Sequence, residues 1–167
     1  PRWFLRQSRV GAPGSVLTAD GEPVGAMRLR PDGRGLLTLE GPRSLWVRTS
    51  DGAARRLTVP NLPHRLAGWS GDRSRILYVE FDADPGVIYS RSHGTLMVVR
   101  ADGAGAPEPL GRGTGNRVRE ADWGRGGIAY GTLDGKVWWL ADGRAQPLEV
   151  ARGDGGLGSV NASTTPA

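Results

Sequence analysis

Apolar residues occur along this chain in short runs that are separated by polar turns. The run at 76–81 (ILYVEF) is rich in β-branched and aromatic residues and has no 3.6-residue period, so it predicts a strand. No stretch carries a long helical pattern between capping residues. Asp-Gly pairs, which favour the tight turns of β-hairpins, lie at 51–52, 102–103, 134–135 and 142–143. The pattern predicts an all-β fold of antiparallel strands.

The stretch 28–58 shows a layout that recurs along the chain. It contains, in order, a PDG turn, an LLTL run, an LWV run, a DG turn and an RLT run. Weaker copies follow, and we place the repeats at about 23–60, 61–113 and 114–152. Each repeat supplies four strands, which in the first are expected at about 24–30, 35–40, 44–50 and 54–59.

Equivalent positions of the repeats are 38 residues (Leu110 to Leu148) to 54 residues (Trp69 to Trp123) apart. The longest interval lies in the second repeat, where residues 82–94 form an extra hairpin or loop. The tryptophans lie at recurring strand positions, so we expect them to pack between the repeats. One position is shared by Leu29, Trp69 and Trp123, and another by Leu45, Leu96 and Val137.

The two ends of the chain differ from the repeats. Residues 1–22 match the last strands of an earlier repeat, because their WFL and VLT runs correspond to LWV and RLT. Residues 153–167 consist mainly of Gly, Ser, Thr and Ala, a composition typical of a flexible tail.

The repeat resembles the TolB-type, WD-like β-propeller family. The likeness rests on Arg30-Pro31-Asp32-Gly33-Arg34, on Ser44-Leu45-Trp46-Val47, and on Asp51-Gly52 followed by Arg56-Leu57-Thr58. The second and third copies depart from it, with Ser70-Gly71-Asp72-Arg73 and Gly124-Arg125-Gly126-Gly127 at the first turn. The resemblance covers about residues 1–150. It implies three four-stranded antiparallel blades plus the outer half of a fourth, an incomplete ring.

The blade count implies a larger assembly. Propellers close a ring with about four to eight blades, and closure protects the strand edges. We therefore expect the ring to be completed by another polypeptide, by sequence outside this chain, or by a second copy in a homo-oligomer.

Composition and charge argue against several classes of protein. Lys136 is the only lysine, and the arginines behind the net charge of +5 are scattered among Asp and Glu, which argues against a nucleic-acid protein. There is no cysteine, and no apolar run is long enough for a membrane span. Residues 1–6 show no leader-like apolar segment. The compartment stays open, and the family resemblance favours a periplasmic or extracytoplasmic location.

Catalytic and metal-binding motifs are missing from the sequence. There is no Gly-x-Ser-x-Gly elbow, and neither His64 nor His93 lies in a catalytic motif, so both are expected to be turn or strand-entry residues. Asp82 and Asp84 lack the further ligands of a calcium loop. We predict a non-enzymatic chain without a metal or cofactor.

The first strand of each repeat carries the best binding candidates. In a propeller this strand lines the central channel, and here it is rich in arginine. We predict a basic channel mouth for an anionic ligand or an acidic peptide, by charge-assisted hydrogen bonds. The alternative is that these arginines pair with Glu120, Asp122 or backbone carbonyls. The candidate residues are Arg28, Arg30, His64, Arg65, Arg117, Arg119 and Asp122, together with His93 in the 82–94 insertion.

Two functions follow from the resemblance. The first is a non-catalytic propeller module that presents its loops and channel mouth to a protein or anionic partner. The second is the gating propeller of a prolyl-oligopeptidase-type serine peptidase whose catalytic domain lies outside this chain. A downstream domain with Gly-x-Ser-x-Gly would decide for the second.

Overall fold

The computed structural model describes residues 6–7, 15–16, 24–40, 44–57, 64–81, 94–110, 117–144 and 146–152. These residues form antiparallel strands and contain no helix, so the all-β prediction is confirmed. None of them forms a helix that could cross a membrane. The ends at 1–22 and 153–167 lie outside the described residues, apart from a short pair formed by β1 (Arg6–Gln7) and β2 (Ser15–Val16).

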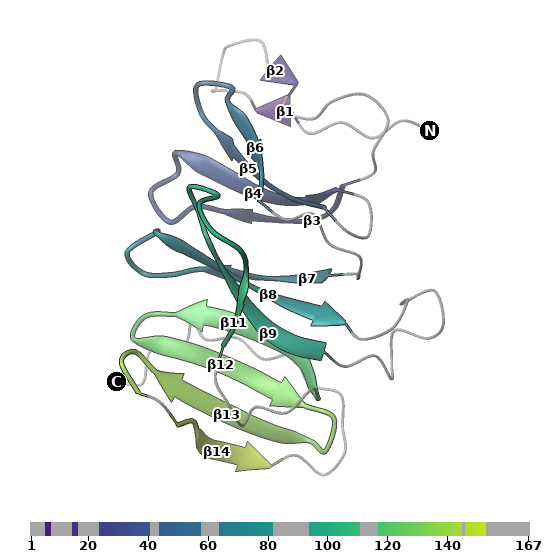
Figure 1. Cartoon of the computed structure of the whole chain (residues 1–167), viewed down its shortest axis with the longest axis vertical. Helices are drawn as coiled ribbons and strands as arrows, with labels where there is room; N and C mark the ends of the chain where they lie inside the picture. The colour runs from purple at the N-terminus through teal and green to yellow at the C-terminus, as the bar shows by residue number, and fades with distance from the viewer. Residues whose placement is uncertain are drawn as a thin grey trace.

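Each repeat is a four-stranded meander (Figure 1). The first consists of β3 (Val24–Leu29), β4 (Gly35–Glu40), β5 (Ser44–Thr49) and β6 (Ala54–Arg56). The second consists of β7 (His64–Trp69), β8 (Arg75–Phe81), β9 (Gly94–Arg100) and β10 (Glu108–Pro109). The third consists of β11 (Val118–Gly124), β12 (Gly127–Thr132), β13 (Lys136–Ala141) and β14 (Leu148–Arg152). The observed strands of the first repeat begin where the sequence predicts, although β6 is shorter.

The second and third meanders are joined into one eight-stranded sheet by a single backbone pair between Val118 and Gly94. At Gly94 a side chain would collide with the neighbouring strand, because a Cβ would lie 2.0 Å from the carbonyl oxygen of Glu80. Because glycine has no side chain, β9 can begin with its backbone in close contact with the backbone of β8 at this junction. The sheet does not close into a ring.

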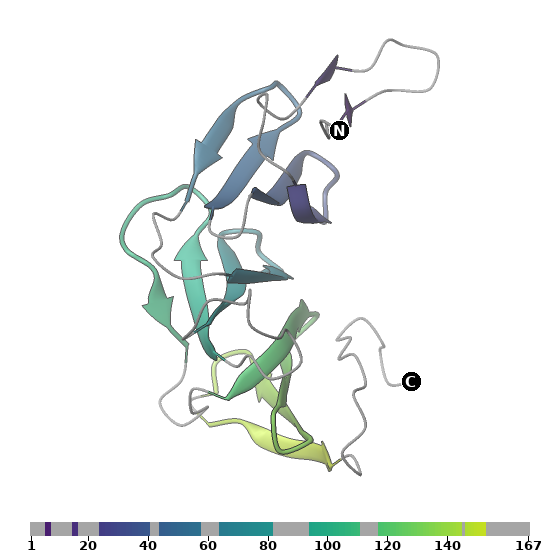
Figure 2. The same cartoon turned by 90° about the vertical axis from the view of Figure 1, so that its right-hand side faces the viewer.

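The core lies between the repeats, which stack in chain order (Figures 1 and 2). We call the side of a repeat that faces the next one its forward face, and the opposite side its backward face. The first seam joins the forward face of the first repeat to the backward face of the second, and the second seam joins the second repeat to the third in the same way. The first seam contains Leu37, Leu39, Leu45, Val47, Leu57, Leu66, Trp69, Ile76, Tyr78 and Val99. The second contains Ala67, Leu77, Val79, Phe81, Leu96, Val118, Ala121, Ile128, Tyr130 and Leu140.

Aspartates organise the turns that link the strands. In the turn after β3, the side chain of Asp32 accepts a hydrogen bond from the backbone N–H of Arg34 at 3.0 Å, and Gly33 takes a φ of 71°. The turn after β7 repeats this geometry with Asp72 and the N–H of Ser74 at 3.1 Å, but its left-handed residue is Arg73, with a φ of 65°. Among the described residues, Arg73 alone takes a positive φ without being glycine.

Candidate functional site

The first strands β3, β7 and β11 run in the same direction (Figure 1) and lie along the inner, concave side of the stack (Figure 2). The tight turns that follow them all lie on one side of the molecule, which we call the turn side. Arg28 and Arg30 are therefore at the turn side, as is Asp122 near the end of β11. His64, Arg65, Arg117 and Arg119 are at the opposite, starting ends of their strands. The structure thus divides the predicted channel residues between two ends and does not gather them in one mouth.

The structure brings Arg65 of β7 and Arg119 of β11 together. The Nη1 of Arg65 donates a hydrogen bond to the backbone carbonyl of Arg119 at 3.0 Å, and its guanidinium lies 5.8 Å from the ring centre of Phe81. This geometry matches the alternative in which these arginines pair with carbonyls. Arg65 ties β7 to β11 across the second seam.

The remaining candidates are placed as follows. Arg28 is exposed and donates a hydrogen bond to the adjacent Met27 carbonyl, while Arg117 is exposed just before β11. Asp122 is half-buried. The side chain of His64 and the whole of His93 lie outside the described part of the chain. A binding role for these residues stays a prediction.

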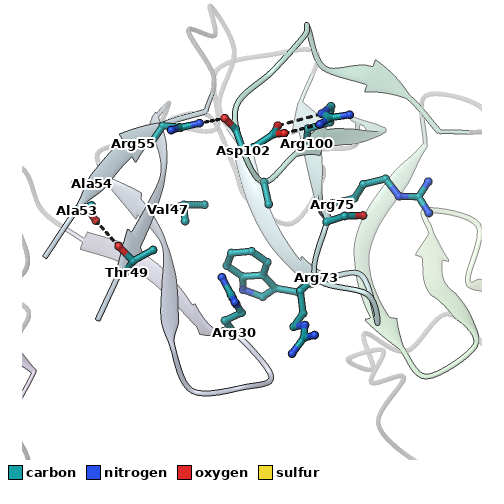
Figure 3. A pocket seen from close by; sticks show the side chains of 13 residues that line it. Arg30, Val47, Thr49, Ala53, Ala54, Arg55, Arg73, Arg75, Arg100 and Asp102 are labelled. Atoms are coloured by element: carbon teal, nitrogen blue, oxygen red, sulfur yellow. Dashed lines mark hydrogen bonds and ion pairs between the residues drawn. The ribbon is translucent and has the colours of Figure 1, made fainter. Parts of the chain in front are cut away.

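A cavity opens on the turn side, at the first seam. It has a volume of about 550 Å³ and is lined by thirteen residues from the first two repeats. Of the sequence-predicted candidates, only Arg30 lines it. Figure 3 shows Arg30 and Arg73 at one end and Arg55, Arg100 and Asp102 at the other. We call this cavity the arginine groove, after its five arginines Arg30, Arg55, Arg73, Arg75 and Arg100.

Two contacts cross the arginine groove in opposite directions. Arg55 of the first repeat donates to the backbone carbonyl of Asp102 in the second. Arg73 of the second repeat reaches Asp32 of the first, with Nη1 at 3.4 Å from Oδ2. The two repeats are therefore held together by polar contacts at both ends of the groove and by the apolar seam beneath it.

Two aspartates at the groove are held by forked ion pairs. The Nε of Arg30 lies 2.9 Å from Oδ1 of Asp32, and its Nη2 lies 2.7 Å from Oδ2. Arg100 donates the same pair of hydrogen bonds to Asp102. The Arg30 hydrogen bonds, with the N–H of Arg34, lower the pKa of Asp32 to about 2. The hydrogen bonds from Arg100 likewise hold the pKa of Asp102 well below its usual range. Both carboxylates are charged at neutral pH.

Sequence reasoning missed four of the five groove arginines. A signal was present, because Arg100 precedes Asp102 by two residues as Arg30 precedes Asp32. Arg73 also replaces the glycine that the other aspartate turns carry. Arg55 could not be found this way, since its reach across the seam depends on how the repeats stack. No cluster of three or more metal-ligating side chains occurs in the described residues.

Comparisons with known proteins bear on the fold. No protein-family model and no curated protein sequence matches this chain. A solved structure of a prolyl endopeptidase matches with a TM-score of 0.66 and 17% identity, over 91% of this chain and 26% of that one. The structure of a putative TolB from Agrobacterium tumefaciens matches with a TM-score of 0.62 and 17% identity, over 90% of this chain and 55% of that one. The chain has a TolB-like β-propeller fold.

The likeness at this identity shows the fold alone, and the chain spans only part of each of these proteins. The three meanders are therefore propeller blades, and the ring they belong to is not closed within the described structure. The resemblance seen in the sequence is confirmed for the fold.

Proposed function

We propose that this chain is a non-catalytic interaction module, a set of propeller blades completed by further blades that cover its end faces. The observation that carries this proposal is the open forward face of the third blade. Leu148 is 67% exposed there, beside Trp139 and Val137 on β13, which are only half-buried. In the first and second blades the forward faces are buried in the seams.

The open face presents apolar side chains, as the buried forward faces of the first two blades do. Trp139 is paired with Ala129 on one side and with Leu148 on the other, so the three side chains share one surface. Its ring lies across Gly127, where a Cβ would come within 2.7 Å of the indole. The neighbouring Trp138 turns the other way and stacks on Tyr130 at a centroid distance of 6.5 Å. An apolar surface of this kind fits the backward face of another blade.

The experiment is size-exclusion chromatography with light scattering on this chain. We expect either a mass above the 17.7 kDa of one chain, when a second copy covers the face, or a monomer that binds apolar dyes and unfolds readily. The variant Trp139→Glu should abolish self-association. A compact, stable monomer that binds no dye and is unchanged by the substitution would contradict the proposal.

The match to a prolyl endopeptidase favours a second candidate, the gating propeller of a serine peptidase. In that case the catalytic serine, histidine and aspartate would be encoded outside this chain. The full reading frame decides between the two candidates, because a Gly-x-Ser-x-Gly motif in an α/β domain is required by the second and not by the first. A periplasmic or extracytoplasmic location also remains part of the proposal, and cell fractionation tests it.

A further inference from the structure

The arginine groove carries more positive charge than its scaffold role requires. Five of its thirteen lining residues are arginines, and Asp102 is the only carboxylate among them. The guanidinium of Arg75 points away from the cavity and lies 5.4 Å from the ring centre of Trp123 in the third blade. The other four arginines face Asp102 and the adjacent Asp32, so the groove holds two more positive charges than negative ones. Like charges gathered in one cavity repel each other, so a structural seam gains nothing from this excess. An anionic ligand would neutralise it.

The size and lining of the groove suit a small molecule. Its volume of about 550 Å³ lies within the range of ligand pockets, roughly 300–1,000 Å³. Val47, Ala54 and Ala101 supply apolar wall between the arginines. Guanidinium groups recognise phosphate and carboxylate through paired hydrogen bonds, and do so best when the arginines are pre-positioned. The forks to Asp32 and Asp102 position Arg30 and Arg100 in this way.

Arg73 adds a second, independent sign. It takes the left-handed conformation that Gly33, Gly52 and Gly103 take in comparable turns, and a non-glycine residue there costs roughly 1 kcal/mol. Its side chain is half exposed, and its contact with Asp32 is long, at 3.4 Å. Strained residues of this kind cluster at binding sites. The positive charge that Arg73 brings to the groove provides a functional reason for an arginine at this strained position.

Trp69 supplies an unused hydrogen-bond donor. It lines the groove and is only 5% exposed, and its indole Nε1 has no hydrogen-bond partner in the described part of the chain. A buried N–H without an acceptor is costly, and indole can only donate. A ligand oxygen seated in the groove would be an acceptor of the required kind.

We propose that the arginine groove binds a small organic anion bearing two or more negative charges on phosphate or carboxylate oxygens. Arg73 and Arg55 enclose the ligand from the two sides of the seam, and Arg30 and Arg100 flank it. The site lies wholly within the first two blades. It therefore does not depend on how the propeller ring is completed.

The test is isothermal titration calorimetry of the full chain at low salt, with pyrophosphate and citrate as separate probes. We expect at least one probe to bind with one-to-one stoichiometry and to weaken as salt is added. Tighter binding of pyrophosphate assigns a phosphate ligand, and tighter binding of citrate assigns a carboxylate ligand. Failure of both probes to bind at millimolar concentration would overturn the proposal.

Three variants locate the site. Arg73→Gly should weaken binding roughly tenfold while the protein stays as thermally stable as the wild type, because relief of the left-handed backbone strain offsets the loss of the long, exposed contact with Asp32. Arg55→Gln should weaken it to a similar degree. Arg125→Gln is the control, since it removes one exposed charge from the equivalent turn of the third blade. Unchanged affinity in both groove variants, or equal losses in all three, would show that no specific site exists.

Discussion

Equivalent positions of the three blades differ sharply in burial. Leu45 and Leu96 are fully buried in the two seams, whereas Val137 on the forward face of the third blade is only half-buried. One pair of equivalent positions on the backward faces shows the same contrast, since Trp69 is 5% exposed and Leu29 is 72% exposed. A blade therefore makes its own strands and turns, but its core is supplied by its neighbours.

The two end faces differ from each other as well. The forward face of the third blade is apolar, whereas the backward face of the first carries a buried ion pair. Arg48 donates from Nη2 to Oε1 of Glu40 at 2.5 Å, and Thr38 donates to the same oxygen at 2.8 Å. Both charged side chains are less than a tenth exposed. The end faces are thus chemically distinct surfaces.

The largest expected effect tests the polar end face. Glu40→Gln leaves Arg48 charged and buried without its partner, so we expect a loss of about 3–5 kcal/mol in the free energy of unfolding. Urea denaturation measures it. The control is Glu149→Gln, which breaks an exposed pair with Lys136 and should cost less than about 1 kcal/mol. Similar losses would mean that the Glu40–Arg48 pair is solvated.

The next effect compares covered and open apolar positions. Leu96→Ala removes a fully buried side chain from the second seam and should cost about 2–5 kcal/mol. Val137→Ala, at the equivalent position on the open face, should cost less than about 1 kcal/mol in the isolated chain. Urea denaturation of both variants checks this. If the valine variant loses as much as the leucine variant, the forward face of the third blade is already covered.

Acid titration tests a turn that forms within a single blade, the Asp72 turn of the second blade. Hydrogen bonds from the hydroxyls of Ser70 and Ser74, and from the N–H of Ser74, lower the pKa of Asp72 to about 2 from a usual 3.8. A lowered pKa stabilises the folded state above pH 3.8, and this stability is lost as the pH falls through about 2. The melting temperature should fall across this window, and Asp72→Asn should make the fall shallower. An identical fall in the variant would exclude this turn as a source of acid sensitivity.

The smallest expected effect concerns the second seam at the inner strands. Arg65→Ala removes the hydrogen bond to the Arg119 carbonyl and the contact with Phe81, and should cost about 1 kcal/mol. Arg117→Ala, which removes an exposed neighbour, should change stability by less than about 0.5 kcal/mol. Thermal denaturation resolves the difference. Equal effects would show that Arg65 does not connect β7 to β11.

The sequence predicted the local structure well and the contacts between blades poorly. Strand periods and Asp-Gly turns are encoded within a few residues, so the meanders and the role of the repeated Trp69 position could be read directly. The joining of two sheets at Gly94 could not, because it depends on a close backbone approach. The arginine groove was missed for the same reason, since Arg55 and Arg73 meet their partners only after the blades stack.

The central claim is that other blades cover the forward face of the third blade. The chain has no cysteine, so a single cysteine introduced at Leu148 can report on this face through its rate of thiol labelling. A cysteine at Arg125, in an exposed turn, serves as the reference. In the native assembly, compared with the isolated chain, we predict that Leu148→Cys becomes strongly protected while Arg125→Cys labels at the same rate. Equal labelling of Leu148→Cys in both states would contradict the account.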